Sequence, residues 1–298
     1  MINDDPIPTV RSFYRALTLR VGVFTDSFLG RGRPLAESRL LFETGGEGAD
    51  VRDLRSWLDL DSGYLSRMLR SLERHGLIEV TTSESDRRSR RARLTDAGLA
   101  ELGELDRLGE RFAEETLEPL SEAERERLVA AMSEVEKLLN LSFTRISVED
   151  PDSPDAKWCL GQYFGELGER FEEGFDAVRS IPADAGDLRP PRGTFLLARL
   201  DGRPVGCGAV KVIGPGVGSI KRMWVSREVR GMGVGRRVLL ALEKEAAGLG
   251  IELLRLETNR SLREAQALYR RNGYEEVAAF NDDPYANHWF EKRLPANP

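Results

Sequence analysis

A short glycine-rich loop is the clearest chemical feature of this sequence. The run Arg230–Gly235 follows a strand-like segment, 218–225, and precedes a helical segment, 236–249, whose apolar residues fall on one face. Glycines let the backbone approach an anion closely, and the following helix directs unpaired N–H groups and its positive dipole end at the same place. Arg230 and Arg236 add positive charge at the rim. The loop therefore predicts a phosphate-binding site.

Taken alone, the loop leaves other interpretations open. A plain turn is the commoner role of such a glycine triplet. A dinucleotide site uses a similar loop, with an acidic residue about 20 positions later. Glu252 and Glu257 stand near that distance, so spacing does not exclude a dinucleotide. The loop lies late in its half of the chain, however, whereas a dinucleotide fingerprint belongs to an early strand-loop-helix unit.

The segments after the loop decide between these interpretations. Residues 251–259 read as a strand, and Ser261 with Glu264 forms a capping-box pattern before the next helix. Together with Arg230-x-x-Gly233-x-Gly235, the run Ala265–Tyr274 resembles the GNAT superfamily of N-acetyltransferases. The resemblance extends over about residues 143–295. It implies an α/β GNAT fold with a central mixed sheet, and acetyl-CoA as co-substrate with an amine as acceptor.

The resemblance also implies roles for individual residues. Met223 and Val225 would bind the pantetheine arm through their backbone, where the strands 218–225 and 251–259 diverge. Asn259 would meet the pantetheine or a bound water, and Tyr269 would protonate the departing thiolate. Backbone amides would cradle the pyrophosphate, and they come from Gly231, Met232, Gly233, Val234, Gly235 and Arg236.

The general base is less clearly marked. The family often has a glutamate near the start of the strand before the loop, and Ser219 stands there in this chain. Glu257 shares a strand face with Asn259 by the period of two, so it could act directly or through water. An ordered water could equally take the proton.

The N-terminal half follows a different pattern. Two short helices, 51–58 and 62–75, are joined by a tight turn, with leucines placed to share one core. This is the helix-turn-helix arrangement. On the second helix, short, polar or cationic residues lie off that core and suit base edges and phosphates in a major groove: Ser62, Gly63, Tyr64, Arg67 and Arg70.

An arginine-rich segment, 83–93, stands between two strand patterns after this second helix. A basic hairpin in that position is typical of a wing that places arginine in a minor groove. The stretches 58–78 and 86–98 resemble the MarR family of winged-helix regulators. The resemblance implies a wing contact through Asp86 and Arg88, and a homodimer formed through the helices expected at 7–30 and 121–141. Arg87, in the same basic run, is a further candidate for DNA contact.

The composition restricts which partners, metals and locations we expect for the protein. The net charge of -6 gives no overall attraction to nucleic acid or to an anionic membrane, so binding to double-stranded DNA requires a local basic patch. Neither the cysteines, Cys159 and Cys207, nor the histidines, His75 and His288, have metal-ligand spacing, so we expect no metal site. The first residues lack the pattern of a signal peptide, and we find no membrane-spanning run, so a cytoplasmic protein is expected.

The sequence thus predicts two domains, a mainly α winged helix-turn-helix domain at 1–142 and a GNAT domain at 143–298. The favoured hypothesis is a DNA-binding transcriptional regulator fused to an active N-acetyltransferase, acting on a small molecule or peptide amine. One alternative is a regulator whose GNAT domain only senses acetyl-CoA or an amine. Another is an enzyme whose N-terminal half serves only for dimerisation.

Overall fold

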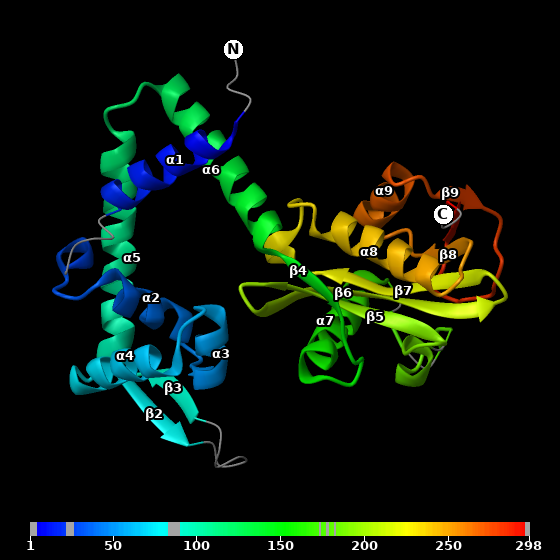
Figure 1. The fold of residues 1–298 in the computed structure, drawn as a ribbon, viewed down its shortest axis with the longest axis horizontal. Helices are drawn as coiled ribbons and strands as arrows, with labels where there is room; N and C mark the ends of the chain where they lie inside the picture. The colour runs from blue at the N-terminus through cyan, green and yellow to red at the C-terminus, as the bar shows by residue number, and fades with distance from the viewer. Residues whose placement is uncertain are drawn as a thin grey trace. The chain divides into compact units, whose positions relative to one another are not determined.

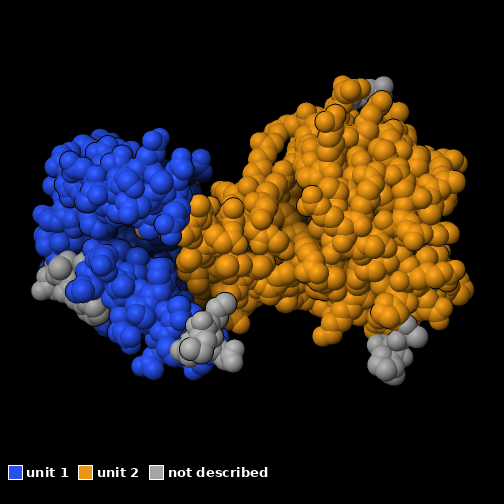
Figure 2. All heavy atoms as spheres, turned by 90° about the horizontal axis from the view of Figure 1, so that it is seen from above, with its two compact units in different colours: residues 1–129 blue, residues 130–298 orange. Residues whose placement is uncertain are grey.

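The computed structural model describes residues 5–21, 27–82, 90–172, 174–176, 179–181 and 183–295. The chain divides into two compact units, residues 1–129 and 130–298, which Figure 2 colours separately. The domain boundary expected at residue 142 falls near the end of helix α6 (Glu122–Phe143) and stays a prediction. Within the described ranges, no helix is both long enough and apolar enough to cross a membrane.

The first unit is mainly helical and has a small three-stranded sheet at one end (Figure 1). Its elements are α1 (Ile7–Arg20), the 3-10 turn η1 (Phe28–Gly30), α2 (Leu35–Thr44), β1 (Ala49–Asp50), α3 (Val51–Trp57), α4 (Ser62–Arg74), β2 (Ile78–Thr82), β3 (Arg90–Leu94), α5 (Asp96–Leu117) and the start of α6. Strand β3 lies between β1 and β2 and pairs antiparallel with both. Leu54 and Leu69, predicted for the shared helix-turn-helix core, are fully buried.

Local capping signals fix where these helices begin. Three side chains accept a hydrogen bond from a backbone N–H in the first turn, namely Asp50 before α3, Asp61 before α4 and Thr95 before α5. The carboxylate of Glu124 accepts from the backbone N–H of Ser121 at 2.9 Å, which is the reciprocal half of a capping box. The side chains of Asp50 and Thr95 thus cap the helices that they precede, and Ser121 with Glu124 forms one half of a capping box.

The helix expected over 7–30 is shorter than predicted. α1 ends at Arg20, and Phe28 begins a separate 3-10 turn. Leu29 has a φ of 50°, which no α-helix contains, and the backbone N–H of Phe28 bonds across the turn to the carbonyl of Arg33 at 2.8 Å. The apolar spacing of the sequence continues beyond Arg20, but the backbone at Phe28–Arg33 forms a turn. Phe24, one of the apolar positions on that pattern, lies outside the described residues.

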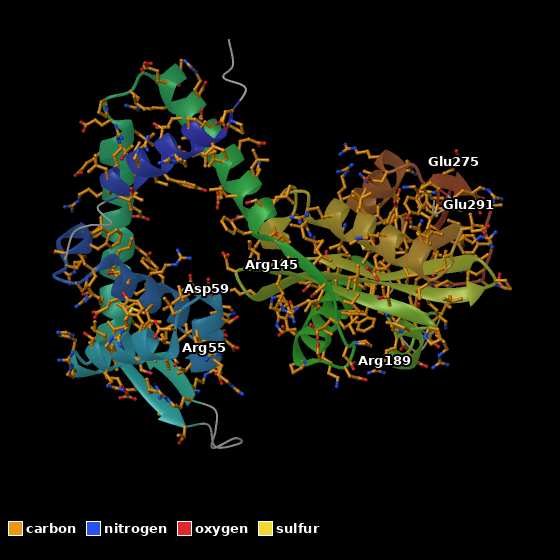
Figure 3. All side chains as sticks on the ribbon, viewed as in Figure 1. Arg55, Asp59, Arg145, Arg189, Glu275 and Glu291 are labelled. Carbon is orange, nitrogen blue, oxygen red and sulfur yellow. The ribbon has the colours of Figure 1, made fainter. Side chains whose placement is uncertain are left out.

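The second unit is a seven-stranded mixed sheet between helices. Beyond α6, its elements are β4 (Arg145–Val148), α7 (Pro154–Arg170), η2 (Ala185–Leu188), β5 (Gly193–Leu200), β6 (Arg203–Gly214), β7 (Val217–Val225), η3 (Arg227–Val229), α8 (Val234–Gly248), β8 (Leu253–Thr258), α9 (Arg263–Arg271), β9 (Glu275–Val277) and β10 (His288–Arg293). The strand order is β4-β5-β6-β7-β8-β10-β9, and only the β7–β8 pair is parallel. Arg145 begins one edge strand, and Glu275 lies opposite Glu291 at the other edge (Figure 3).

The two faces of this sheet have separate cores because strand side chains alternate between faces. Leu196 and Val210 pack with α8 and α9 on one face. Phe195 and Cys207 pack with Cys159 of α7 on the other face. Figure 1 shows α8 and α7 on opposite sides of the strands. The sheet therefore packs between two helical layers.

The capping box expected at Ser261 and Glu264 does not form. α9 begins at Arg263 without a side-chain cap, and the hydroxyl of Ser261 is buried without a hydrogen-bond partner. Instead, both residues contact Arg170 of α7. Its guanidinium pairs with the Glu264 carboxylate and donates to the Ser261 carbonyl at 2.7 Å. A contact between distant segments therefore overrides the local pattern.

Candidate functional site

The predicted recognition helix, α4, presents its polar positions to solvent. Tyr64, Arg67 and Arg70 are exposed, as are Ser62 and Gly63, while the core residues of the helix face inward. The guanidinium of Arg67 lies 5.6 Å from the ring centre of Tyr64. The helix thus offers a cationic and aromatic face of the kind that binds DNA.

The wing is described only at its base. β2 and β3 form an antiparallel hairpin, and their pairing extends as far as Thr82 opposite Arg90. The predicted contacts Asp86, Arg87 and Arg88 lie outside the described residues. Of the basic segment, Arg90 is exposed, and Arg91 is held by hydrogen bonds to the carbonyls of Glu47 and Gly48.

In the second unit, the parallel strands β7 and β8 separate part of the way along. They pair from Val217 to Ser219 on β7, and the later residues of β7 have no partner on β8. A bulge at Arg222, where φ is 59°, bends β7 at this point. The sheet therefore opens beside Met223 and Val225, as the sequence predicts.

A groove with a volume of about 710 Å³ starts at this opening and extends along the glycine loop. Gly233 caps α8 with a φ of 88°, and Gly231 has a φ of 77° with open space where a Cβ atom would stand. Both conformations favour glycine. Gly235 and the start of α8 complete this wall of the groove. Met232 does not line the groove, because its sulfur accepts from the Asn140 side chain at 3.7 Å.

The charge in the groove differs from the expectation in one respect. Arg230 is engaged inside the protein, donating to the Glu166 carboxylate and, at 3.0 Å, to the Val225 carbonyl. Burial acts to raise the pKa of Glu166, but hydrogen bonds from Arg230 and Arg170 outweigh it and hold the pKa below its usual value. Arg236 lines the groove and is exposed, although its side chain also donates to Asn272 at 3.2 Å.

Arg271 on α9 also lines the groove and was missed by sequence reasoning. No described carboxylate pairs with Arg236 or Arg271, so these two cations remain available at the groove wall. Arg271 stands in the last turn of α9, where a cation most often complements the helix dipole, and the sequence offered no reason to single it out.

A smaller inner cavity, about 90 Å³ in volume, lies next to the groove. The two cavities share wall residues, among them Tyr163, Met223 and Tyr269. Tyr269 is only 5 % exposed, and burial raises its pKa far above the ordinary value, with Tyr163 and Glu257 acting in the same direction. Its hydroxyl therefore stays protonated at neutral and mildly alkaline pH.

Glu257 and Asn259 both line the inner cavity, as their shared strand face predicts. The Glu257 carboxylate forms an ion pair with Lys221, and both side chains are largely buried. The Asn259 side chain donates to the Tyr285 carbonyl at 2.7 Å and accepts from the Ser261 N–H at 2.9 Å, so its amide orders the chain after β8. Ser219 is buried in the paired part of β7 and does not line either cavity.

Lys221 was also missed by the sequence reasoning. The signal that could have found it is the strand register. Ser219 lies opposite Arg255, so two further residues along each strand bring Lys221 beside Glu257. Register between strands that are far apart in the sequence cannot be read from either strand alone.

A mixed sheet that opens beside a glycine-capped helix, with a buried tyrosine between two cavities, defines an acyltransferase of the GNAT type. The chain belongs to the acetyltransferase (GNAT) family, whose profile matches residues 158–274. An IAA acetyltransferase from Azospirillum brasilense is 36% identical over 127 residues, which make up 42% of this chain and 77% of that protein.

The N-terminal half matches a second profile, that of a winged helix DNA-binding domain, at residues 40–98. The protein is therefore a fusion of a winged-helix DNA-binding domain with a GNAT acetyltransferase domain, and both predicted resemblances are confirmed at this level.

Solved structures resemble each half of the chain. A GNAT acetyltransferase from Staphylococcus aureus is 18% identical, with a TM-score of 0.40, and the match covers 51% of this chain and 99% of that one. A MarR variant from E. coli is 21% identical, with a TM-score of 0.39, and the match covers 45% of this chain and 99% of that one.

Proposed function

We propose that the protein transfers acetyl from acetyl-CoA to a primary amine and binds double-stranded DNA through its winged helix as a transcriptional regulator. In this assignment the groove holds the coenzyme and the inner cavity holds the amine. The Azospirillum brasilense relative is named an acetyltransferase, which supports acetyl as the transferred group.

The groove suits coenzyme A in shape and charge. Gly231 leaves open space for a close approach of phosphate, Gly233 supplies the left-handed cap of α8, and the first turn of α8 faces the phosphate with backbone N–H groups. Arg236 and Arg271 supply positive charge for phosphates. Where β7 leaves β8, Met223 and Val225 offer backbone groups to the amides of the pantetheine arm, in the manner of an added strand.

The observation that carries the proposal is the position of Tyr269 in the walls of both cavities. The amine nitrogen attacks the thioester carbonyl, a C–N bond forms and the C–S bond breaks. The sulfur then leaves as a thiolate that takes a proton from Tyr269. The raised pKa keeps that proton on the hydroxyl at neutral pH. Glu257, directly or through water, is the candidate to accept the proton that the nitrogen loses.

The winged-helix half supplies the DNA-binding part of the proposal. The exposed face of α4 would enter the major groove, with the wing beside it. Neither α1 nor α6 contains a buried residue, and both expose large apolar side chains, among them Val10, Phe13, Val129 and Met132. Such faces support a homodimer, which would read two half-sites on one duplex.

The decisive experiment measures release of free CoA thiol from acetyl-CoA in the presence of amino acids, polyamines, aminoglycosides and peptides. We expect amine-dependent release, and we expect Tyr269→Phe to lower kcat by about 10²–10⁴-fold with unchanged affinity for acetyl-CoA. Tyr64→Phe, in the other unit, is the matched control. Release that persists in Tyr269→Phe would contradict the assigned acid.

The second candidate function is a sensor that binds acetyl-CoA or an amine without useful turnover. One observation favours it: the candidate base Glu257 is already paired with Lys221, so its carboxylate is less available to take a proton from the amine. No thiol release across the whole panel, combined with tight acetyl-CoA binding, would establish the sensor in place of the enzyme.

A further inference from the structure

Arg222 occupies a costly position in the wall of the inner cavity. It is the bulged residue of β7, and its φ of 59° lies in the left-handed region, where a side chain other than glycine is strained. Glycine would relieve that strain at this point of the strand. An arginine here indicates that the guanidinium has a use.

The arginine is held in place from both ends. The buried thiol of Cys207 donates to the Arg222 carbonyl at 3.3 Å, which fixes the bulge from the neighbouring strand β6. At the other end, the guanidinium lies 4.7 Å from the centre of the Phe164 ring on α7. A stacked guanidinium keeps its N–H edge free for hydrogen bonds in the ring plane.

The other charged groups of the inner cavity already have partners. Lys221 is paired with Glu257. The carboxylate of Asp283 accepts three hydrogen bonds, from the Ser180 hydroxyl at 2.9 Å, the Ile181 N–H at 3.1 Å and the Tyr285 N–H at 2.9 Å. No described carboxylate forms an ion pair with Arg222. Among the described wall residues, Arg222 is therefore a cation without an ion-pair partner, while the Asp283 carboxylate is bonded only by neutral donors.

The electrostatic influence of this cation is visible at Tyr163, a residue shared by both cavities. Burial raises the pKa of the Tyr163 hydroxyl to about 12, and the positive charge of Arg222, together with its hydrogen bond to that hydroxyl, acts against the increase. The guanidinium thus acts on groups inside the cavity rather than only on solvent.

The wall beyond Arg222 is aromatic. Phe171, Phe175 and Tyr285 line the inner cavity and contact one another, with ring centres 4.9 to 5.8 Å apart. Arg179 lies over the Tyr285 ring, with its guanidinium 5.8 Å from the ring centre. Such a wall suits a flat or branched apolar group, because aromatic faces bury apolar area with little loss of side-chain freedom.

We propose that Arg222 selects an acceptor that carries a carboxylate beside its amine, with an apolar side group, as in an apolar α-amino acid. The inference rests on the proposed transfer to an amine in this cavity. A guanidinium binds a planar carboxylate through two parallel N–H···O bonds, which also orient the molecule that carries it. With the carboxylate held at Arg222, the apolar group would pack against the aromatic wall.

The test compares each of two acceptors, L-leucine and L-phenylalanine, with its carboxamide, using CoA thiol release. We expect kcat/KM at least tenfold higher for the acids in the native protein, although the amides carry the less basic and more readily deprotonated amine. Arg222→Met and Arg222→Gly should raise KM for the acids and remove the preference, and Arg222→Lys should keep part of it. Glycine accepts the bulge conformation, so loss in that variant cannot be ascribed to strain.

Arg255→Met is the matched control, because Arg255 also lies over an aromatic ring, that of Phe280, but lines neither cavity. It should keep the native preference. Equal or better use of the amides by the native protein would overturn the proposal, as would an equal loss on acids and amides in Arg222→Met.

A binding measurement separates this inference from the proposed function. Calorimetry with N-acetyl-L-phenylalanine and its carboxamide needs no turnover. Tighter binding of the acid, lost in Arg222→Gly, would support the carboxylate subsite even if no thiol is released, in which case only the transferase assignment fails. Equal binding of acid and amide would reject the subsite even if transfer to other amines is found.

Discussion

The two candidate sites place their functional side chains in opposite environments. On α4 of the first unit, the predicted DNA-binding positions are exposed, and neither Arg67 nor Arg70 forms an ion pair with a carboxylate in the described structure. In the second unit, Tyr269 is buried, Glu257 is paired with Lys221, and Arg230 is paired with Glu166. A surface that meets a large polyanion keeps its cations free, whereas a cavity for a small reactant fixes its groups in advance.

This difference predicts how independent the two sites are. A change in the cavity walls should alter acetyl-CoA binding and leave DNA binding intact, and a change on α4 should do the reverse. The predictions below test that separation, beginning with the largest expected effect.

Gly235→Glu should nearly abolish acetyl-CoA binding. Gly235 lies in the groove wall, where an added Cβ would contact the Val225 and Leu268 side chains at 3.5 and 3.6 Å, and a carboxylate there would repel phosphate. We expect an affinity loss of at least ~100-fold by calorimetry, or roughly 2.8 kcal/mol. Gly248→Glu is the control, because it lies on the same helix with open space around it. Unchanged affinity in Gly235→Glu would remove the loop from the binding site.

The second unit should lose stability above about pH 10. Tyr269 and Tyr274 are buried with raised pKa values, so they keep their protons when folded, while the unfolded chain releases them near pH 10. Unfolding then releases protons, and stability falls by up to about 1.4 kcal/mol per pH unit for each tyrosine. Below pH 10 both states hold these protons, and the effect vanishes.

Urea unfolding followed by tryptophan fluorescence at about pH 9 and about pH 11 measures this loss. The slope should be smaller in Tyr269→Phe. A pH slope that is the same in Tyr269→Phe would show that other groups cause the loss.

Arg67→Ala and Arg70→Ala should each weaken binding to a mixed-sequence duplex by about tenfold at low salt. Each removes an exposed cation from α4, so the slope of log affinity against log salt should fall by about one for every phosphate that is no longer neutralised. Arg107→Ala is the control, because Arg107 is an exposed arginine of α5 paired with Glu104. Native salt dependence in both α4 variants would place the DNA-binding surface elsewhere. Thiol release should be unchanged in all three.

The smallest expected effect compares two helix starts, one in each unit. Thr95→Ala should cost about 1 kcal/mol, because the Thr95 hydroxyl caps α5 and bonds to the N–H of Gly98 at 3.0 Å. Ser261→Ala should cost less than about 0.5 kcal/mol or stabilise, because it removes a buried hydroxyl that has no partner. Urea unfolding of both variants checks this, and a larger cost at Ser261 would indicate that its hydroxyl is bonded.

Features set by neighbouring residues were predictable from the sequence, and features set by distant contacts were not. The caps at Asp50 and Thr95, the exposed face of α4 and the glycine cap of α8 all depend on local spacing or local conformation. The failed capping box at Ser261 depends on another segment, because Arg170 of α7 takes the Glu264 carboxylate and the Ser261 carbonyl.

The candidate site divides in the same way. The resemblance to the GNAT superfamily indicated Tyr269 and Asn259, and strand periodicity added Glu257; all three line one cavity. The partner of Arg230 comes from α7, 64 positions earlier in the chain, and α7 has no motif that marks it. The sequence alone therefore suggests that Arg230, beside the glycine loop, binds phosphate, whereas the structure pairs it with the Glu166 carboxylate.

The separation of β7 from β8 has a further consequence for the backbone. Each strand keeps its outer neighbour, β6 on one side and β10 on the other, while the facing edges beyond Ser219 carry amides without a ladder partner. The sheet therefore has a gap in its hydrogen bonding between β7 and β8, which we call the seam. The amides that face this seam should exchange hydrogen with solvent faster than those of the paired strands. In the proposed function, the pantetheine arm completes the sheet along that seam. Slower exchange at residues 220–225 on addition of acetyl-CoA would then record the position of the arm directly.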